Sequence, residues 1–345
     1  MALRKLLNTL YITAPEAYLG RERENVIVRI DDEIRFRIPI HNLESIVTFG
    51  YVGASPDLMY LCAERGVSLA FLSPSGRLRA KLATPTKGNV LLRRKQYHMA
   101  DDVGETLNMA RNFVFGKLHN CRAVLRRYLR DYADSEASAA VERATRDLSF
   151  QLERVLVTED IDELRGIEGE GTRTYYGAFD HLILEAKDVF CFRRRSRRPP
   201  LDPVNALLSF LYSLLAHDCS AALETVGLDP QVGFLHSMRP GRDSLALDVM
   251  EELRPYLVDR LSLSMINTRQ LSIKDFEVQE GGAVLLNDEG RKKVIQAWQS
   301  RKRELIIHPY LQERIEIGLV AYAQALLLAR CVRGDLDAYP PFLWK

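Results

Sequence analysis

Short runs of alternating apolar and polar residues fill the first eighty or so positions. Ile34, Phe36, Ile38 and Ile40 alternate with two arginines and Pro39, which predicts a half-buried strand. Pro39 cannot donate a backbone hydrogen bond, so we expect this strand at the edge of a sheet. The other strands predicted from apolar runs span residues 10–13, 26–30, 43–49, 67–72 and 77–82.

One helix interrupts these strands. Ser55 is a favourable N-cap, Pro56 suits the first helical position, and Asp57 places an acid in the first turn. Gly66 ends the helix. The pattern therefore predicts a small β-strand domain with one helix over residues 1–87.

Apolar residues recur at helical spacing in the rest of the chain. The stretch ATPTKG, residues 83–88, is rich in helix and strand breakers, so we place a domain boundary there. Helices are predicted at 89–99, 105–132, 136–157, 164–184, 202–216, 220–226, 291–303 and 310–332, with another from 244 and a minor hairpin at 276–286. The fold class is α+β multidomain: the N-terminal β domain is followed by a larger all-α C-terminal domain, residues 88–345.

The stretch GFLHSMRPGRDSLALDVMEELRP, residues 233–255, joins a histidine loop to an amphipathic helix that Asp243 or Ser244 would cap. The apolar stripe of this helix is Ala246, Val249, Met250, Leu253 and Leu257. At about 100° per residue, three acids fall on the opposite face: Asp248, Glu251 and Glu252. That face is either solvated or, with His236, part of a metal site. Helical spacing alone does not rank the three acids.

Composition narrows the class of protein. A chain of 345 residues, 47% hydrophobic and 27% charged, is typical of a two-domain globular protein. The longest apolar run, residues 318–329, is shorter than the roughly 18–20 residues that span a bilayer, and residues 1–13 lack a secretion signal. The five cysteines include no C-x-x-C pair, which argues against disulfides or a thiolate zinc site. We expect a cytoplasmic protein without membrane association.

Positive charge is concentrated in two places. No acid lies between Glu64 and Asp101. The basic residues of that interval are Arg65, Arg77, Arg79, Lys81, Lys87, Arg93, Arg94 and Lys95. A second run contains Arg193, Arg194, Arg195, Arg197 and Arg198. Each run could be a solvated loop, but two such runs together favour nucleic-acid binding, because clustered arginines and lysines attract phosphates.

The familiar phosphate-loop, dinucleotide and zinc-helix motifs are absent. What remains is His236 with carboxylates that could converge on it. Glu168 is predicted in the first turn of a tyrosine-rich helix, where it could simply complement the helix dipole. Gly169 and Gly171 beside it indicate a close backbone approach or a tight turn. Mixed histidine and carboxylate ligands would suit Mg²⁺ or Mn²⁺ acting on a phosphodiester.

Several separated blocks carry a resemblance to a known family. GFLH followed by PGRxSLALDxMEELRP resembles the signature of the CRISPR-associated spacer-acquisition integrases, the "Cas-one" family. LRGIEGEGTRTYY, residues 164–176, is similar to that family's second block, and DPVNALLSFLYSLL, residues 202–215, and GLDP before the histidine also fit. The similarity runs over the whole chain. The N-terminal LLNTLYIT and PIHNLESIVTFG and the Phe342-Leu343-Trp344 end resemble the type I-C branch.

The resemblance assigns roles that spacing leaves open. It implies that Glu168, His236 and Glu251 bind the metal and that Asp248 is an accessory acid. It places Arg239 and Arg254 near the reacting phosphate. Plausible contacts to DNA or to the metal ligands are Tyr176, Asn205 and Tyr212. The sequence departs from the family at Glu170-Gly171, where a small residue is expected in place of Glu170, which could compete for the metal.

On this resemblance the protein is a metal-dependent DNA endonuclease and integrase of CRISPR adaptation. It would insert captured double-stranded DNA fragments at the CRISPR repeat by attack of a 3′-hydroxyl on a phosphodiester. Similar proteins form homodimers bridged by a "Cas-two" subunit, and systems like type I-C add a "Cas-four" nuclease. The alternatives are a branched-DNA nuclease acting in repair and a non-catalytic DNA-binding scaffold.

Overall fold

The structure, a computed structural model, describes residues 9–14, 16–43, 45–74, 78–82 and 90–344. Its N-terminal part contains two four-stranded sheets, ordered β1-β5-β7-β8 and β4-β3-β2-β6. The strands are β1 (Thr9–Ile12), β2 (Tyr18–Glu22), β3 (Asn25–Ile30), β4 (Glu33–Pro39), β5 (Ser45–Phe49), β6 (Gly53–Ala54), β7 (Ser68–Leu72) and β8 (Leu78–Lys81). The predicted β region is confirmed, and β4, which ends at Pro39, is an edge strand as expected.

The helix of this region, α1 (Pro56–Arg65), begins and ends where the sequence indicates. Ser55 Oγ accepts a hydrogen bond from the amide of Leu58, and Gly66 closes the helix in a left-handed conformation with φ of 70°. Strands β2 and β6 are not predicted by the sequence pattern. β2 is held by antiparallel pairing with β3 and by burial of Leu19, which a five-residue run interrupted by Gly20 does not reveal.

The remainder of the chain is mainly helical. Its helices are α2 (Val90–Asp101), α3 (Val103–Asp131), α4 (Ser138–Val157), α5 (Ile161–Phe179), α6 (Pro203–Val226), α7 (Ser244–Leu253), α8 (Arg260–Asn267), α9 (Asp288–Arg303) and α10 (Val320–Arg333). Two hairpins, β9 (Phe276–Val278) with β10 (Val284–Leu286) and β11 (Leu305–Ile307) with β12 (Arg314–Glu316), interrupt the helices. The region is therefore not all-α. The boundary expected at residues 83–88 lies outside the described residues.

Several helices begin or end at other residues than predicted; the helix expected at 164–184, for example, is α5, which spans Ile161–Phe179. The two helices expected at 202–216 and 220–226 form the single helix α6, because the polar pair between them faces partners inside the protein. His217 Nε2 lies 3.2 Å from Ser45 Oγ, and Asp218 accepts from Lys302 Nζ at 2.7 Å. The helix expected from residue 310 begins only at Val320, because the preceding residues pair as β12 with β11.

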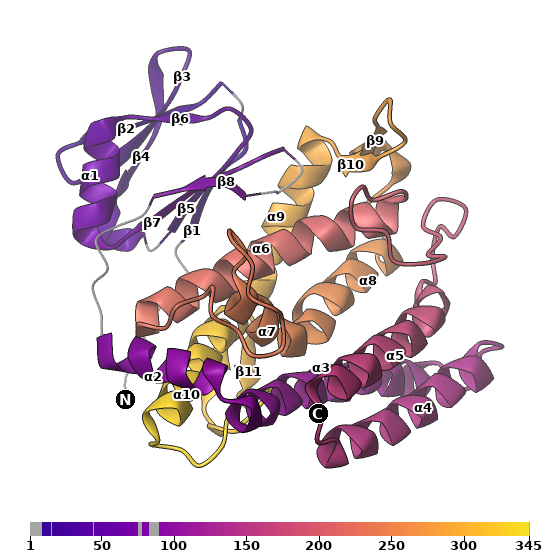
Figure 1. Cartoon of the computed structure of the whole chain (residues 1–345). Helices are drawn as coiled ribbons and strands as arrows, with labels where there is room; N and C mark the ends of the chain where they lie inside the picture. The colour runs from indigo at the N-terminus through magenta and orange to yellow at the C-terminus, as the bar shows by residue number, and fades with distance from the viewer. Residues whose placement is uncertain (1–8, 15, 44, 75–77, 83–89, 345) are drawn as a thin grey trace.

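The two parts of the chain share a hydrophobic core. Val47, Phe49, Ala70 and Leu72 from the first sheet belong to the same buried cluster as the helices, and the ring of Phe49 stacks on Phe210 of α6 at 5.6 Å. Figure 1 shows the β region set against α6, with α3, α4 and α5 side by side farther away. α6 is long and apolar enough to cross a membrane, but it is mostly buried inside this core.

Directly after α7 the helix continues as a π-helical segment, η3 (Arg254–Asp259). Pro255 causes this change, because it has no amide to donate to the carbonyl of Glu251 four residues earlier and its ring crowds that carbonyl. The distortion thus begins at the helical turn that carries Glu251.

Candidate active site

The three acids of α7 are buried. Asp248 and Glu252 are 0% exposed and Glu251 is 3% exposed. The interpretation of this helix face as solvated is therefore wrong. Buried carboxylates require hydrogen bonds or opposite charges, and each of the three has a different set of partners.

Asp248 holds the histidine loop. Its carboxylate accepts from the amides of Phe234, Leu235 and His236, at 2.6, 3.0 and 2.9 Å, and from Nδ1 of His236 at 2.7 Å. Because Asp248 accepts at Nδ1, that nitrogen carries the proton and Nε2 keeps its lone pair. A Cβ on Gly233 would lie 2.8 Å from this carboxylate, so the loop approaches α7 closely only because residue 233 is glycine.

α5 fastens the same loop from the other side. Arg165 donates from Nε and Nη2 to the carbonyl of Leu235, at 3.1 and 3.0 Å.

Asp160 caps α5 by accepting from two amides, so Glu168 lies in the middle of the helix. The expectation that Glu168 is a first-turn acid is therefore wrong. Gly171 makes the close approach that the sequence indicates, against Leu118 of α3, whereas a Cβ built on Gly169 would meet no described atom from outside the neighbouring helix backbone within 4 Å.

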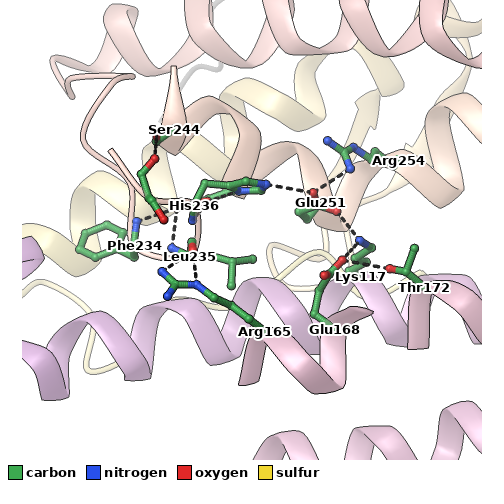
Figure 2. Close-up of polar contacts among 12 residues, drawn as sticks. Lys117, Arg165, Glu168, Thr172, Phe234, Leu235, His236, Ser244, Glu251 and Arg254 are labelled. Atoms are coloured by element: carbon green, nitrogen blue, oxygen red, sulfur yellow. Dashed lines mark hydrogen bonds and ion pairs between the residues drawn. The ribbon is translucent and has the colours of Figure 1, made fainter. Parts of the chain in front are cut away.

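Glu168 and Glu251 face one another across Lys117 of α3, as Figure 2 shows. Lys117 Nζ donates to Oε1 of Glu168, which also accepts from Thr172 Oγ1 at 2.9 Å. The same Nζ lies 2.8 Å from Oε2 of Glu251. Oε1 of Glu251 lies 2.7 Å from Arg254 Nη1 and 3.6 Å from His236 Nε2. Helices α3, α5 and α7, the π-helical segment η3 and the histidine loop thus bring these side chains together.

Opposite charges balance at this site. Burial alone would raise the pKa of Glu251, but the charges of Arg254 and Lys117, with His236, outweigh it and lower that pKa to about 2. Burial also acts against the charged form of Lys117, yet Glu251 and Glu168 hold the pKa of its ammonium above the usual value. The charges of Glu168 and Glu251 are therefore balanced by those of Lys117 and Arg254.

The donor set fits a hard divalent cation. Two carboxylates and an imidazole nitrogen are ligands that Mg²⁺ and Mn²⁺ accept. Oε2 of Glu251 is buried, and Lys117 Nζ at 2.8 Å is its partner among the described residues, so a cation already stands against this oxygen. The Lys117 ammonium is the cation that now stands between the carboxylates. Among the described residues, no three His, Cys, Asp or Glu side chains stand close enough to hold a metal ion together.

Glu252 points away from this site, toward residues 339–344. Oε2 accepts from the amide of Phe342 at 2.7 Å, while Oε1 accepts from Gln324 Nε2 at 2.9 Å and from the Tyr339 hydroxyl. Asn120 of α3 joins the two segments, donating to the carbonyls of Glu252 and Phe342 at 2.7 Å each. Glu252 therefore anchors the C-terminal segment behind α7.

The predicted DNA-contacting residues divide into exposed and buried groups. Arg193, Arg194, Arg197 and Arg198 are exposed, as are Arg94 and Lys95 of α2, and Arg93 is half-buried. Arg239 is exposed on the histidine loop. Arg242, beside it, has a pKa lowered first by burial and then by the charges of Arg239 and Arg198. Arg242 therefore lies within electrostatic range of two other arginines.

Arg195 and Asn205 turn inward. Asn205 is 0% exposed. Its carbonyl oxygen accepts from Arg195 Nη1 at 2.6 Å and from the amide of Ser196 at 3.0 Å, and its Nδ2 donates to the carbonyl of Arg194 at 2.8 Å. The structure thus places Asn205 as an anchor of the arginine run and does not bring it to the surface.

Tyr176 and Tyr212 form a half-buried pair beside Arg254. Their hydroxyls lie 2.7 Å apart, and that of Tyr212 donates to Asp259 at 2.5 Å. Arg254 lies over the ring of Tyr212 at 5.1 Å, so the tyrosine supports the arginine that contacts Glu251. Glu170 faces elsewhere and pairs with Arg154 of α4 at 2.8 Å.

Two residues of the site escaped the sequence analysis. Lys117 lies inside a long amphipathic helix whose pattern gives no sign that one lysine is 5% exposed. Arg165 falls within the LRGIEGEG block but resembles any exposed arginine of a helix until its contact with Leu235 is known. A lysine or arginine on an otherwise apolar helix face would have been the only available signal.

Two carboxylates that face each other, an imidazole whose Nε2 keeps its lone pair and exposed arginines nearby are typical of enzymes that act on the phosphodiesters of nucleic acids. A family model described as CRISPR associated protein Cas1 matches residues 10–300. The chain therefore belongs to the Cas1 family, and it is an endonuclease and integrase involved in spacer acquisition.

The relatives match over the full length. A CRISPR-associated endonuclease Cas1 of Rhodospirillum rubrum is 51% identical, with 99% of this chain and all of that protein covered. One from Chlorobaculum tepidum is 48% identical at the same coverage. The solved structure of a Cas1 protein from Thermotoga maritima has a TM-score of 0.81 at 24% identity and covers 95% of this chain and 97% of its own, which confirms the fold.

Other similar proteins carry partners or DNA. A Cas4/Cas1 fusion of Rhodospirillum rubrum is 33% identical over 96% of this chain and 57% of the fusion. A Cas6-RT-Cas1–Cas2 complex contains a chain with a TM-score of 0.82 at 22% identity, covering all of this chain and 37% of that one. A casposase bound to its integration product has a TM-score of 0.85 at 21% identity, covering 98% and 94%.

Proposed function

We propose that Glu168, His236 and Glu251 bind the Mg²⁺ or Mn²⁺ ion of an integrase centre. The observation that carries this proposal is the contact between Asp248 and Nδ1 of His236, because it leaves the Nε2 lone pair on the side of Glu251, 3.6 Å from its carboxylate. In this tautomer Nε2 carries no proton. It can therefore bind a cation but cannot donate a hydrogen bond.

The proposed reaction is a transesterification. The 3′-hydroxyl oxygen of a captured DNA fragment bonds to phosphorus at the repeat boundary, the bond from that phosphorus to the flanking strand's 3′-oxygen breaks, and the departing oxygen gains a proton as the attacking one loses its own. The ion, when bound, supplies Lewis acidity toward the phosphate. Arg254, held beside Glu251 and over Tyr212, would stabilise charge on the phosphate.

Exposed arginines would hold the DNA. Arg239, Arg242 and Arg198 approach one another closely enough to affect the pKa of Arg242, and such a like-charged group binds phosphate favourably because it releases counterions. Arg193, Arg194 and Arg197, with Arg93, Arg94 and Lys95 of α2, would extend this contact along the duplex. Asp248 acts in this proposal by positioning His236.

The wider assembly follows from the family. We assign this chain to a homodimer bridged by a Cas2 ("Cas-two") subunit, with a Cas4 ("Cas-four") nuclease as a further partner, in a cytoplasmic type I-C system. The Cas4/Cas1 fusion and the Cas1–Cas2 assembly among the similar proteins support these partners. The subtype rests on the N-terminal and C-terminal sequence features alone.

A strand-transfer assay tests the proposal. Purified protein with its Cas2 subunit receives a labelled DNA fragment and a repeat-bearing plasmid in Mg²⁺, in Mn²⁺ or in a chelator. Wild type should join the fragment only with metal, and Glu168→Ala, His236→Ala and Glu251→Ala should lose nearly all activity while remaining folded. Glu170→Ala, which removes a neighbouring acid of the same helix paired with Arg154, should retain activity. Strand transfer that persists in chelator would contradict the metal mechanism.

The alternatives give different results in the same assay. A repair nuclease would cut branched DNA but would not join the fragment to the repeat. A DNA-binding scaffold would show the same behaviour before and after His236→Ala.

A further inference from the structure

We propose that Lys117 is a built-in counter-ion that occupies the position of the metal and must leave it before a divalent cation binds. This inference rests on the proposed metal centre and adds to it a residue that sets how tightly metal is held. Lys117 is 5% exposed, and its ammonium contacts both carboxylates that are proposed as ligands.

Geometry identifies the ammonium as a competitor. Lys117 Nζ donates to Oε1 of Glu168 and lies 2.8 Å from Oε2 of Glu251. A divalent ion bridging the same two residues would need those oxygens. It would also stand within a few ångströms of a positive charge, since the flexible lysine stem ends between them. A small cation and an ammonium therefore exclude each other at this position.

The charges of the surrounding residues lead to the same conclusion. Arg254 already contacts Oε1 of Glu251 at 2.7 Å, so Lys117 and Arg254 together neutralise the two carboxylates. Removing Lys117 leaves one excess negative charge in a buried place. The metal-free protein should then be less stable, because an unbalanced buried charge is costly, and a divalent cation should bind more tightly. Opposite effects on stability and on metal affinity distinguish a counter-ion from a residue that helps to bind the metal.

The main test measures Mn²⁺ binding by titration calorimetry on full-length wild type and on Lys117→Met, whose unbranched side chain has a similar length. We expect the Kd to fall by about tenfold or more in the variant. We also expect the melting temperature to fall without metal and to rise more on Mn²⁺ addition than in wild type. Lys292→Met is the matched control, because it removes an exposed lysine paired with Glu289 at 2.7 Å, and it should leave the Kd unchanged.

A second measurement needs no variant of the site. Wild-type protein is treated with an amine-acetylating reagent with and without Mn²⁺, and modified lysines are quantified by mass spectrometry. Modification of Lys117 should rise severalfold with Mn²⁺, whereas that of Lys292 should stay constant. This measurement decides the matter if Lys117→Met does not fold.

The outcomes separate the two proposals. Wild type that binds no Mn²⁺ overturns the metal centre itself. Mn²⁺ binding with an equal or weaker affinity in folded Lys117→Met, or a Lys117 equally protected with and without Mn²⁺, overturns the counter-ion role and leaves the metal centre standing.

Discussion

Each carboxylate of α7 is defined by the groups that donate to it. Asp248 receives three amides and an imidazole N–H, Glu251 faces two cations, and Glu252 receives an amide, a hydroxyl and a side-chain amide. Periodicity could place these acids on one helix face but could not distinguish them, because their partners come from distant parts of the chain. The resemblance to the family selected Glu251, and the geometry explains why Asp248 and Glu252 differ from it.

Asp248→Asn should weaken strand transfer by about 10- to 100-fold, because it disturbs the residue that orients a proposed metal ligand. The side-chain nitrogen of asparagine is a donor, and it would replace one of the oxygens that accept from the loop amides and from His236 Nδ1. His236 would then no longer be held in one tautomer. Strand-transfer rates, compared with those of the surface control Asp131→Asn, check this expectation. Wild-type rates in a folded Asp248→Asn protein would show that His236 does not depend on Asp248.

His308 should make the protein sensitive to acid. It is 0% exposed and accepts from the amide of Leu311 through Nδ1, and burial lowers its pKa to about 4. Because this pKa lies below the usual 6.5, the folded state favours neutral His308. The contribution of His308 to the free energy of unfolding is fully present above pH 6.5 and is lost as pH falls through 4, by about 3 kcal/mol at most. Urea unfolding between pH 7 and 4 measures this loss.

His217, whose pKa burial also lowers to about 4, contributes in the same direction. His308→Gln should therefore make the pH dependence shallower without abolishing it, whereas the exposed control His98→Gln should leave it unchanged. A slope identical to wild type in His308→Gln would exclude His308 as a source.

At the scale of elements, the sequence predicts where helices lie better than it predicts where they begin and end. Ser55 and Gly66 bound α1 as their chemistry dictates, whereas α6 continues through His217 and Asp218 because Ser45 and Lys302 bind them. A local pattern carries capping and periodicity but does not show which polar residues find a distant partner. The short strands β2 and β12 were missed for the same reason, since pairing holds them in place.

Glu252→Gln tests the junction between α7 and the C-terminal segment. The substitution keeps the shape but replaces one accepting oxygen with a donor, opposite groups that already donate. We expect a loss of about 1–3 kcal/mol in the free energy of unfolding, the usual cost of a buried polar group without its partner. Urea denaturation measures it, with exposed Glu289→Gln as the control. An unchanged midpoint would mean that the segment is held by its apolar contacts.

At the scale of the whole molecule, the α+β class and the division into a β region and a mainly helical region followed from the change in hydrophobic period. The hydrophobic core that the two regions share could not be predicted from this change. Phe49 and Phe210 stack across the two regions, and neither residue carries a sign of that contact in its local sequence. The candidate site behaves likewise, because Lys117, Glu168, His236 and Glu251 are spread over more than a hundred residues and meet only through tertiary packing.

Electrostatic attraction to DNA is a property of the whole surface. If Arg239 and Arg242 contact phosphates, Arg239→Ala and Arg242→Ala should each weaken DNA binding and reduce the slope of log Kd against log salt by about 1. Fluorescence anisotropy with duplex DNA at several salt concentrations measures both effects. Arg146→Ala, which removes an exposed arginine of α4 paired with Glu142, is the control and should leave the slope unchanged. The same slope in all four proteins would place the DNA elsewhere.

The contacts that fix α7 also set the order in which the protein can mature during translation. Asn120 bonds to Phe342 across 222 positions of sequence, and Glu252 bonds to the same residue across 90. At about 5–20 residues per second, the ribosome needs roughly ten seconds or more after synthesising Asn120 to deliver Phe342. Until then Glu252 lacks the Phe342 amide and the Tyr339 hydroxyl that bond to it in the folded protein. A nascent chain therefore cannot form the contacts that Asn120 and Glu252 make with Phe342, next to Glu251. Its active site is complete only after the last hundred residues have been synthesised.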